Sequence, residues 1–321
     1  MATNEKLVVD IISGHKISRQ EAEALFEIDT IDLLAGADKI REHFKGKKIS
    51  LCSIINAKSG SCSENCAFCA QSIHHKTKVE KYPLVNSEAI TAAVQASVKN
   101  HVGCFGIITS GNAASESEVD KICVSIEENK KHGIRISASI GSADTERLKK
   151  LKKSGLKRFH HNIETAESFF HNICTSHSYT DRVATAKAAK KAGLELCCGG
   201  IFGLGENRSQ RVEFAFAVKD IDADSVPLNF LNPIAGTPLA GQKPISPEEI
   251  LKIIAVMRYI LPEKDISICG GREVNLRDLQ SWIFFAGANG MMTGGYLTTP
   301  GRGVQQDLQM IEDLGFTVNK S

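Results

Sequence analysis

The chain has 321 residues, 42% of them hydrophobic and 24% charged, with 26 Gly and 8 Pro, which is typical of a globular protein with ample material for a core. This composition excludes a disordered, collagenous or fibrous chain. Because 39 Lys and Arg balance 37 Asp and Glu to a net charge of +2, nucleic acid is not an expected partner.

The apolar runs are too short for a membrane protein. The longest, such as 250–257 and 282–288, fall well below the roughly 20 residues that cross a bilayer. The N-terminus has no basic segment followed by an apolar core, so no secretory signal is visible. We therefore expect a cytoplasmic protein without a membrane partner.

Helical spacing of apolar residues between Ser18 and Ala37 predicts one or two N-terminal helices. Short β-branched or apolar runs then alternate with segments of helical period. The predicted strands are 49–55, 104–109, 134–140, 156–163, 194–202, 225–231, 265–269 and 288–293. The predicted helices between them are 87–99, 115–132, 144–153, 180–192, 206–219, 246–261 and 275–286, with one more after Arg302.

Eight strands alternating with helices indicate an α/β fold of the (β/α)₈ barrel type, with a doubly wound open sheet as the alternative. No composition break or low-complexity linker marks a second domain. We expect a helical extension over 1–46 packed on a barrel over 47–321. In such a barrel the loops that follow the strands build the active site.

The most specific motif is a trio of cysteines, Cys62, Cys66 and Cys69, spaced CxxxCxxC after the first predicted strand. Clustered thiols in a chain without an export signal favour metal ligation over disulfides. A fourth nearby cysteine that would close a zinc site is absent, and three thiolates suit a [4Fe–4S] cluster with one iron open to a small molecule. Structural thiols, or zinc with a remote fourth ligand, are the alternatives.

With Phe68 before the last cysteine, this loop resembles that of the radical S-adenosylmethionine (SAM) enzymes. Further motifs extend the resemblance to the biotin synthase family, from about Lys47 to the C-terminus. They are 59–72 (SGSCSENCAFCAQS), 161–165 (HNIET), 199–206 (GGIFGLGE), 226–229 (VPLN), 236–239 (GTPL), 271–273 (GRE) and 297–300 (LTTP).

The resemblance implies that the three cysteines hold a [4Fe–4S] cluster whose open iron binds SAM. It implies cleavage of SAM to a 5′-deoxyadenosyl radical, hydrogen abstraction from C9 and C6 of dethiobiotin, and sulfur insertion to form biotin. It also implies a flavodoxin-type or ferredoxin-type electron donor and a homodimer. No side chain is expected to act as a catalytic acid or base, since the cofactors carry the chemistry.

The resemblance also implies two sets of binding residues. The SAM set is Asn162, Glu164, Arg182, Gly199, Gly200, Ile201 and Gly203. The dethiobiotin set is Asn162, Asn229, Thr298 and Thr299. The family more often has Asp at the position of Glu164 and Asn at that of His160, so the roles of Glu164 and His160 are open, and a structural role is expected for His161. The alternative for Arg182 is a solvent-exposed charge on a helix. The alternative for the glycines and threonines is a structural role in turns.

One part of the family pattern is missing. Three cysteines and one arginine usually hold a second, [2Fe–2S] cluster, and those positions fall on Gly106, Ser137, Cys197 and Ser267 here. Other thiols keep the same strand face two residues away. We therefore expect a different auxiliary cluster, of unknown type, held by residues drawn from Cys52, Cys104, Cys197 and Cys269.

The alternative for these four cysteines is ordinary core packing, which is also the role expected for Cys123 and Cys174. Cys198 faces away from Cys197 on a regular strand and is a poorer ligand candidate. For the whole protein, the alternatives are another radical SAM activity, of hydrogenase-maturation or rearrangement type, and a non-catalytic iron–sulfur carrier or zinc-stabilised barrel.

Overall fold

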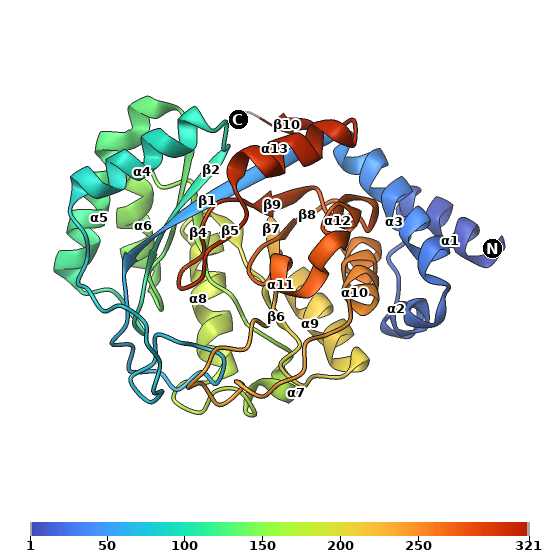
Figure 1. Cartoon of the computed structure of the whole chain (residues 1–321), viewed down its shortest axis with the longest axis horizontal. Helices are drawn as coiled ribbons and strands as arrows, with labels where there is room; N and C mark the ends of the chain where they lie inside the picture. The colour runs from blue at the N-terminus through green and yellow to red at the C-terminus, as the bar shows by residue number, and fades with distance from the viewer. Residues whose placement is uncertain (1, 320–321) are drawn as a thin grey trace.

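Parallel strands form the centre of the structure, a computed structural model that describes residues 2–319 (Figure 1). The strands are β1 (Lys48–Lys58), β2 (Cys104–Thr109), β3 (Arg135–Ser139), β4 (Arg158–His160), β5 (Glu195–Cys197), β6 (Gly200–Phe202), β7 (Ser225–Phe230), β8 (Asp265–Ile268), β9 (Gly290–Met292) and β10 (Thr317–Asn319). Strand β9 pairs with β1, so the sheet closes on itself. The predicted (β/α)₈ barrel is confirmed and the open sheet is excluded.

Helices surround the barrel and connect its strands (Figure 1). They are α4 (Ser87–Lys99), α5 (Glu116–Asn129), α6 (Thr145–Ser154), α7 (Glu167–Phe170), α8 (Tyr179–Lys191), α9 (Arg208–Asp220), α10 (Pro247–Ile260), α11 (Arg272–Leu276), α12 (Trp282–Phe285) and α13 (Val304–Asp313). Short 3₁₀ turns, η2 (Lys130–His132) and η3 (Arg277–Leu279), follow α5 and α11. Several helices begin at the side-chain caps that the sequence favours, such as Ser115 and Ser246.

The N-terminal residues form α1 (Ala2–Ile12), α2 (Arg19–Ala24), η1 (Leu25–Glu27) and α3 (Thr30–Lys45). These helices pack beside α10 and α9 on the outside of the barrel (Figure 1). The predicted boundary at residue 46 falls on Gly46, the residue at which α3 ends before β1 begins. Helix α1 was not predicted from the sequence.

Two local predictions are wrong, and one strand was not predicted. The strand expected over 194–202 is interrupted: β5 pairs with β4 and β7, whereas β6 pairs with β7 and bridges Glu164 through Gly200. The helix expected over 275–286 is broken, because Arg277 takes a left-handed conformation at φ 51° and ends α11. The strand β10, which pairs with the start of β1, was not expected at all.

Side chains alternate along each strand, so that one set faces the surrounding helices and the other set faces the inside of the barrel. On β8, Ile266 and Ile268 are fully buried on the helix side, whereas Asp265 and Ser267 face the inside. The same alternation turns Ile136 and Ala138 on β3 away from Ser137. Branched aliphatic side chains usually fill such a barrel. Here cysteine, serine and arginine side chains line the interior together with aliphatic ones and leave a cavity.

Candidate functional site

A cavity of about 670 Å³ occupies the inside of the barrel. Its wall contains residues from the loops after the strands, such as Cys62 and Thr298, and residues near the strand starts, such as Lys45 and Arg135. This volume lies within the range of small-molecule binding sites.

The three cysteines of the CxxxCxxC motif lie in the wall of this cavity, and none forms a disulfide. Backbone hydrogen bonds fold their loop: Cys62 N donates to Gln71 O at 3.0 Å, and Cys69 N donates to Cys66 O at 2.9 Å. Burial raises the pKa of Cys69 to about 11, so ionising this thiol without a bound cation is unfavourable. Three soft, clustered sulfur donors of this kind fit an iron–sulfur cluster, which would supply that positive charge.

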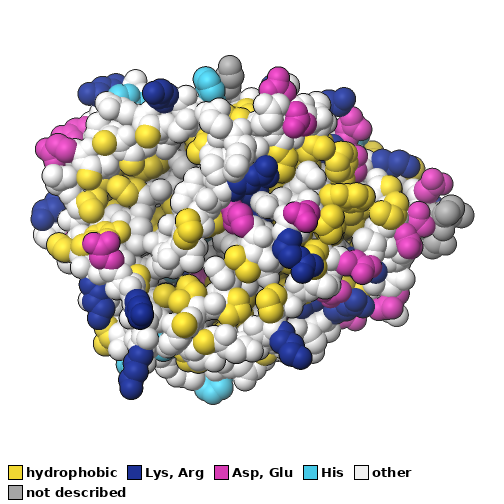
Figure 2. All heavy atoms as spheres, in the orientation of Figure 1, with side chains coloured by type: hydrophobic (Ala, Val, Ile, Leu, Met, Phe, Trp, Pro, Cys, Tyr) yellow, Lys and Arg dark blue, Asp and Glu magenta, His cyan; other side chains and the backbone are white. Residues whose placement is uncertain are grey.

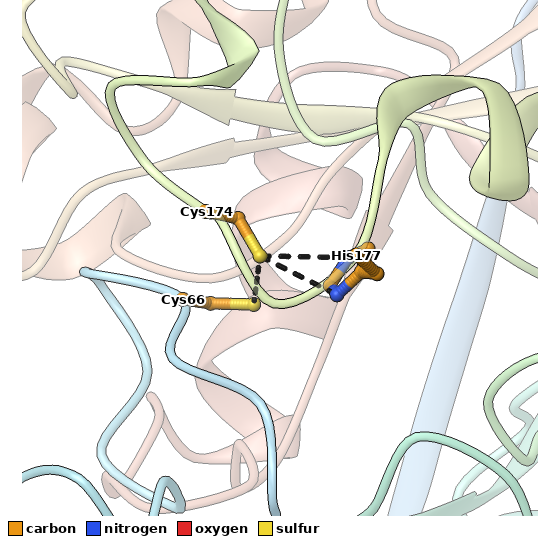
Figure 3. A group of neighbouring side chains, drawn as sticks. All are labelled: Cys66, Cys174 and His177. Atoms are coloured by element: carbon orange, nitrogen blue, oxygen red, sulfur yellow. Dashed lines mark hydrogen bonds between the residues drawn. The ribbon is translucent and has the colours of Figure 1, made fainter.

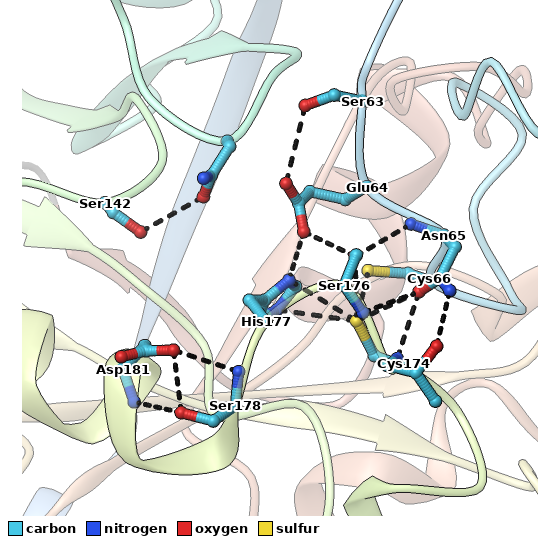
Figure 4. A network of polar contacts seen from close by, with 12 residues as sticks. Ser63, Glu64, Asn65, Cys66, Ser142, Cys174, Ser176, His177, Ser178 and Asp181 are labelled. Atoms are coloured by element: carbon cyan, nitrogen blue, oxygen red, sulfur yellow. Dashed lines mark hydrogen bonds and ion pairs between the residues drawn. The ribbon is translucent and has the colours of Figure 1, made fainter.

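A second loop brings unpredicted residues to Cys66. Cys174 Sγ lies 3.7 Å from Cys66 Sγ, and His177 Nδ1 lies 3.3 Å from Cys174 Sγ (Figure 3). His177 also pairs with Glu64, with Nδ1 2.5 Å from Oε2 (Figure 4). The sequence analysis gave Cys174 only a packing role and did not single out His177 or Glu64. The usable signal was a Cys-x-x-His spacing, which falls in the loop between α7 and α8.

Three polar residues form one wall beside the cysteine loop. Arg182 Nη2 donates to Glu164 Oε1 at 2.8 Å, and Arg182 Nε donates to Asn162 O at 2.6 Å. Asn162 Nδ2 donates to Glu164 Oε2 at 3.2 Å. Burial raises the pKa of Glu164, and the positive charge of Arg182 opposes this rise. All three side chains line the cavity, which makes Arg182 a site residue rather than a solvated helix charge.

The glycine-rich segment has a structural reason for its glycines. A Cβ on Gly199 would lie 1.9 Å from Pro227 O, and one on Gly200 would lie 2.3 Å from Glu164 O. Gly203 has φ +89°, a conformation that disfavours other residues. Of the predicted SAM residues here, Ile201 lies in the cavity wall. The SAM-binding role of the glycines stays a prediction.

The predicted substrate residues also reach the cavity. Asn229 on β7 donates from Nδ2 to Gly200 O at 3.1 Å and accepts at Oδ1 from Gly270 N at 2.9 Å. Backbone groups therefore fix the orientation of its amide. Thr298 and Thr299 lie in the cavity wall on the loop after β9.

Deeper in the same cavity lie Cys52, Cys104, Cys197 and Cys269. Cys52 and Cys104 are register partners on β1 and β2. A hydrogen bond between the Cys52 and Cys269 thiols, together with burial, raises the pKa of Cys52 well above its ordinary value. Burial raises the pKa of Cys197 to about 12. The structure thus brings all four predicted thiols to one interior.

A positive charge and a histidine accompany these thiols. The Arg158 guanidinium lowers the pKa of Cys52, Cys104 and Cys197 by its charge, against the effect of burial. His160 Nδ1 lies 3.3 Å from Cys197 Sγ, and burial lowers the pKa of His160 to about 4, so the ring is neutral. Soft sulfur donors beside one fixed cation fit an anionic iron–sulfur cluster.

Of the remaining candidates, three line the same cavity and one lies in the apolar core. Ser137 and Ser267 face the cavity, and Gly106 is the register partner of Ser137, so the usual [2Fe–2S] ligand positions do meet here without their thiols. Cys198 is buried in the apolar core outside the barrel. His161 is buried in the cavity wall and stacks on Phe159, with the two ring centroids 6.2 Å apart.

Comparisons with known proteins agree with this geometry. Residues 58–218 match the model of the radical SAM superfamily, and residues 227–317 match that of the Biotin and Thiamin Synthesis associated domain. A biotin synthase of Citrifermentans bemidjiense is 54% identical over 319 residues, covering 97% of each chain. A biotin synthase of Geobacter sulfurreducens is 53% identical over 321 residues, covering 98% of each chain.

Solved structures share the fold at low identity. Methylornithine synthase superposes with a TM-score of 0.83 at 20% identity, covering 98% of this chain and 97% of that one. The [FeFe]-hydrogenase maturase HydG superposes with a TM-score of 0.84 at 16% identity, covering 99% of this chain and 75% of that one.

A closed parallel barrel with three thiols in the loop after its first strand defines a radical SAM enzyme. Within this class, the relatives that match over nearly their full length are biotin synthases. The chain therefore belongs to the biotin synthase family. No helix within residues 2–319 has the length and apolar character needed to cross a membrane.

Proposed function

We propose that this protein converts dethiobiotin to biotin, and that an auxiliary iron–sulfur cluster of a type unlike the usual one supplies the sulfur. The observation that carries the proposal is the presence of two sets of thiols in one cavity. Cys62, Cys66 and Cys69 lie in the loop after β1, and four further cysteines lie deeper between the strands.

Cys62, Cys66 and Cys69 would hold the [4Fe–4S] cluster. When bound, this cluster and SAM supply a carbon radical strong enough to remove hydrogen from the unactivated C9 and C6 positions of dethiobiotin. The protein has to place the substrate and exclude water, since a radical would otherwise attack other groups. The enclosing barrel wall meets both requirements.

The polar wall would bind SAM. The Arg182 guanidinium offers donors to a carboxylate, and Glu164 and Asn162 offer acceptors and donors to hydroxyl and amino groups. Ile201 would pack against an apolar face of the ligand. Gly199 and Gly200 keep the backbone close to this wall, since Gly199 N donates to Asn162 Oδ1 and a Cβ on Gly200 would meet Glu164 O. Gly203 would supply the positive φ of the turn that follows.

Asn229, Thr298 and Thr299 would bind dethiobiotin, with Asn162 at the boundary between the two ligands. The ureido ring and the tail carboxylate need uncharged hydrogen-bonding partners, which these side chains provide. The amide of Asn229 is already oriented by Gly200 and Gly270, so it would meet the substrate without reorganisation.

Cys52, Cys104, Cys197 and Cys269 are the residues that would hold the auxiliary cluster. Cys269 precedes Gly270, whose N–H is bonded to Asn229, so a cluster held by these cysteines would place a sulfide near a substrate bound at Asn229. The neutral ring of His160 beside Cys197, and the Arg158 charge, would stabilise the thiolate form of the ligands.

A flavodoxin-type or ferredoxin-type donor and a homodimer belong to the same proposal. Figure 2 shows hydrophobic side chains gathered over α12. The large apolar residues exposed on and beside this helix are Trp282, Phe285 and Leu279. Such a patch supports association with a second protein surface.

Anaerobic incubation with SAM, a reductant and dethiobiotin tests the proposal. We expect both biotin and 5′-deoxyadenosine to form. Deoxyadenosine without biotin would keep the radical chemistry and overturn the assigned product. A protein that binds iron but forms neither product would instead be an iron–sulfur carrier.

A further inference from the structure

Three metal-ligating side chains converge where the loop after β1 meets the loop before α8. Donor atoms of Cys66, Cys174 and His177 all lie within 4.8 Å of one another (Figure 3). Within residues 2–319, no other set of three cysteine, histidine or acidic side chains is gathered so closely. Cys174 and His177 have no role in the proposed reaction.

The spacing of these atoms matches a single tetrahedral ion. Two thiolates that are each about 2.3 Å from a zinc ion lie about 3.8 Å apart in a tetrahedron. The observed separation of Cys66 Sγ and Cys174 Sγ is 3.7 Å. The His177 ring nitrogens lie 3.3 and 3.7 Å from Cys174 Sγ, close to the separation that a zinc-bound imidazole requires.

A carboxylate pairs with the imidazole of this group but is not one of the donors that lie within 4.8 Å of one another. Glu64 Oε2 lies 2.5 Å from His177 Nδ1, and only 12% of the Glu64 side chain and 11% of the His177 side chain are exposed. Glu64 would orient the imidazole from outside the ligand set. The donor set is therefore two thiolates and one imidazole.

Hydrogen bonds outside the donor set hold the two loops together. Asn65 Oδ1 accepts from Thr175 N at 3.0 Å and from Ser176 N at 3.1 Å (Figure 4). Asn65 N in turn donates to Ser176 Oγ at 3.1 Å. The donors thus meet before any ion arrives, which lowers the cost of binding one.

We propose that Cys66, Cys174 and His177 bind one Zn²⁺ ion when the iron–sulfur cluster is absent. Because Cys66 belongs to both sets of ligands, zinc and the [4Fe–4S] cluster exclude each other. Zinc at this position blocks cluster assembly until it is removed. This exclusion rests on the proposed role of Cys66 as a cluster ligand, whereas zinc binding itself does not.

Cobalt titration of the full-length, cluster-free protein tests the proposal, under anaerobic conditions with a phosphine reductant. Co²⁺ in a tetrahedral thiolate site gives intense charge-transfer and visible bands, and Zn²⁺ should abolish them. We expect one Co²⁺ per chain in the wild type. Loss of an outer-shell partner of a metal already weakens binding by roughly 10–100-fold, so Cys174→Ser should weaken it by at least about tenfold.

Matched variants separate this site from the cluster. Cys62→Ser should bind Co²⁺ like the wild type but fail to assemble the [4Fe–4S] cluster. Cys174→Ser and His177→Gln should assemble that cluster, and zinc added beforehand should no longer slow its assembly. Cys123→Ser on α5 should match the wild type in both measurements.

Two results would overturn the zinc site. One is unchanged cobalt affinity and band intensity in both Cys174→Ser and His177→Gln. The other is a loss of binding in Cys62→Ser as large as that in Cys174→Ser, which would place the ion on the CxxxCxxC loop. Failure of the cluster assignment has a different signature, namely normal cluster content in Cys62→Ser.

Discussion

Arg182 spans the two residues of the strand end that the family resemblance assigns to SAM. Its Nη2 donates to Glu164 Oε1 at 2.8 Å, and its Nε donates to the backbone oxygen of Asn162 at 2.6 Å. Glu164 has φ 67°, a backbone conformation that is uncommon outside glycine. The guanidinium fork thus holds a strained acidic residue in one orientation at the cavity wall.

We predict that Arg182→Lys weakens SAM binding by about tenfold or more without loss of the [4Fe–4S] cluster. A lysine is a point charge and cannot span both partners, so at least one charge-assisted hydrogen bond of roughly 1.5–3 kcal/mol is lost. Equilibrium dialysis of SAM and iron and sulfide analysis measure the two quantities. Arg135→Lys, near the strand start at the other end of the cavity, is the control. Equal SAM affinity in the wild type and Arg182→Lys would contradict the assignment.

The deep thiols give a second prediction. If Cys52, Cys197 and Cys269 ligate an auxiliary cluster, each single change to Ala should lower the iron and sulfide content per chain and abolish biotin formation. SAM cleavage to 5′-deoxyadenosine should persist, since the CxxxCxxC loop is untouched. Cys123→Ala is the matched control, because this cysteine is half-buried on α5 outside the cavity. Unchanged iron and sulfide in all three variants would eliminate the second cluster.

The sequence predicted those parts of the molecule that depend on local spacing. The period of two along a strand placed Cys104 and Cys269 on the inner face, and the cavity includes both. The CxxxCxxC motif required no tertiary information, because its three residues share one loop. The alternation of strands and helices was sufficient to predict the barrel.

The sequence did not predict contacts between distant loops. Cys66 and Cys174 are 108 residues apart, and their meeting depends on how Asn65 joins the two loops. The interruption between β5 and β6 has the same origin. Gly199 lies between β5 and β6, where a Cβ would be 1.9 Å from Pro227 O, and Pro227 lies on a different strand, β7. Such close contacts between distant segments arise from tertiary packing, so the periodicity of the sequence does not predict them.

The tight packing at Gly200 leads to a third prediction. An added Cβ would lie 2.3 Å from Glu164 O and 2.7 Å from the Phe214 ring, so the backbone must shift. We expect Gly200→Ala to destabilise the protein by about 1–3 kcal/mol. Urea unfolding followed by circular dichroism measures the change. Gly241→Ala serves as the control, since nothing lies within 4 Å of its added Cβ, and equal stability of the two variants would refute the packing argument.

The fourth prediction concerns pH and the contact between α9 and α10. Glu249 on α10 accepts from Arg208 Nη2 at 2.7 Å and from Arg211 Nη1 at 2.6 Å, and only 19% of its side chain is exposed. Burial raises the pKa of Glu249. The hydrogen bonds and positive charges of the two arginines lower this pKa by more than burial raises it, so the net shift is downward. A carboxylate with a lowered pKa stabilises the fold above its unfolded pKa, and this contribution is lost as pH falls through the folded pKa.

We therefore expect Glu249→Gln to cost about 1–2 kcal/mol of unfolding free energy near neutral pH. The difference from the wild type should shrink as pH falls below the unfolded glutamate pKa of about 4.3 and then through the lower folded pKa, because the wild-type carboxylate becomes protonated over this range. Glu27→Gln is the control, because Glu27 also pairs with Arg208 but is 80% exposed, and its loss should cost below about 0.5 kcal/mol. Denaturant titrations between acid and neutral pH decide the matter. If Glu249→Gln lowered the unfolding free energy by the same amount at every pH, the negative charge of Glu249 would not be the source of its stabilising effect.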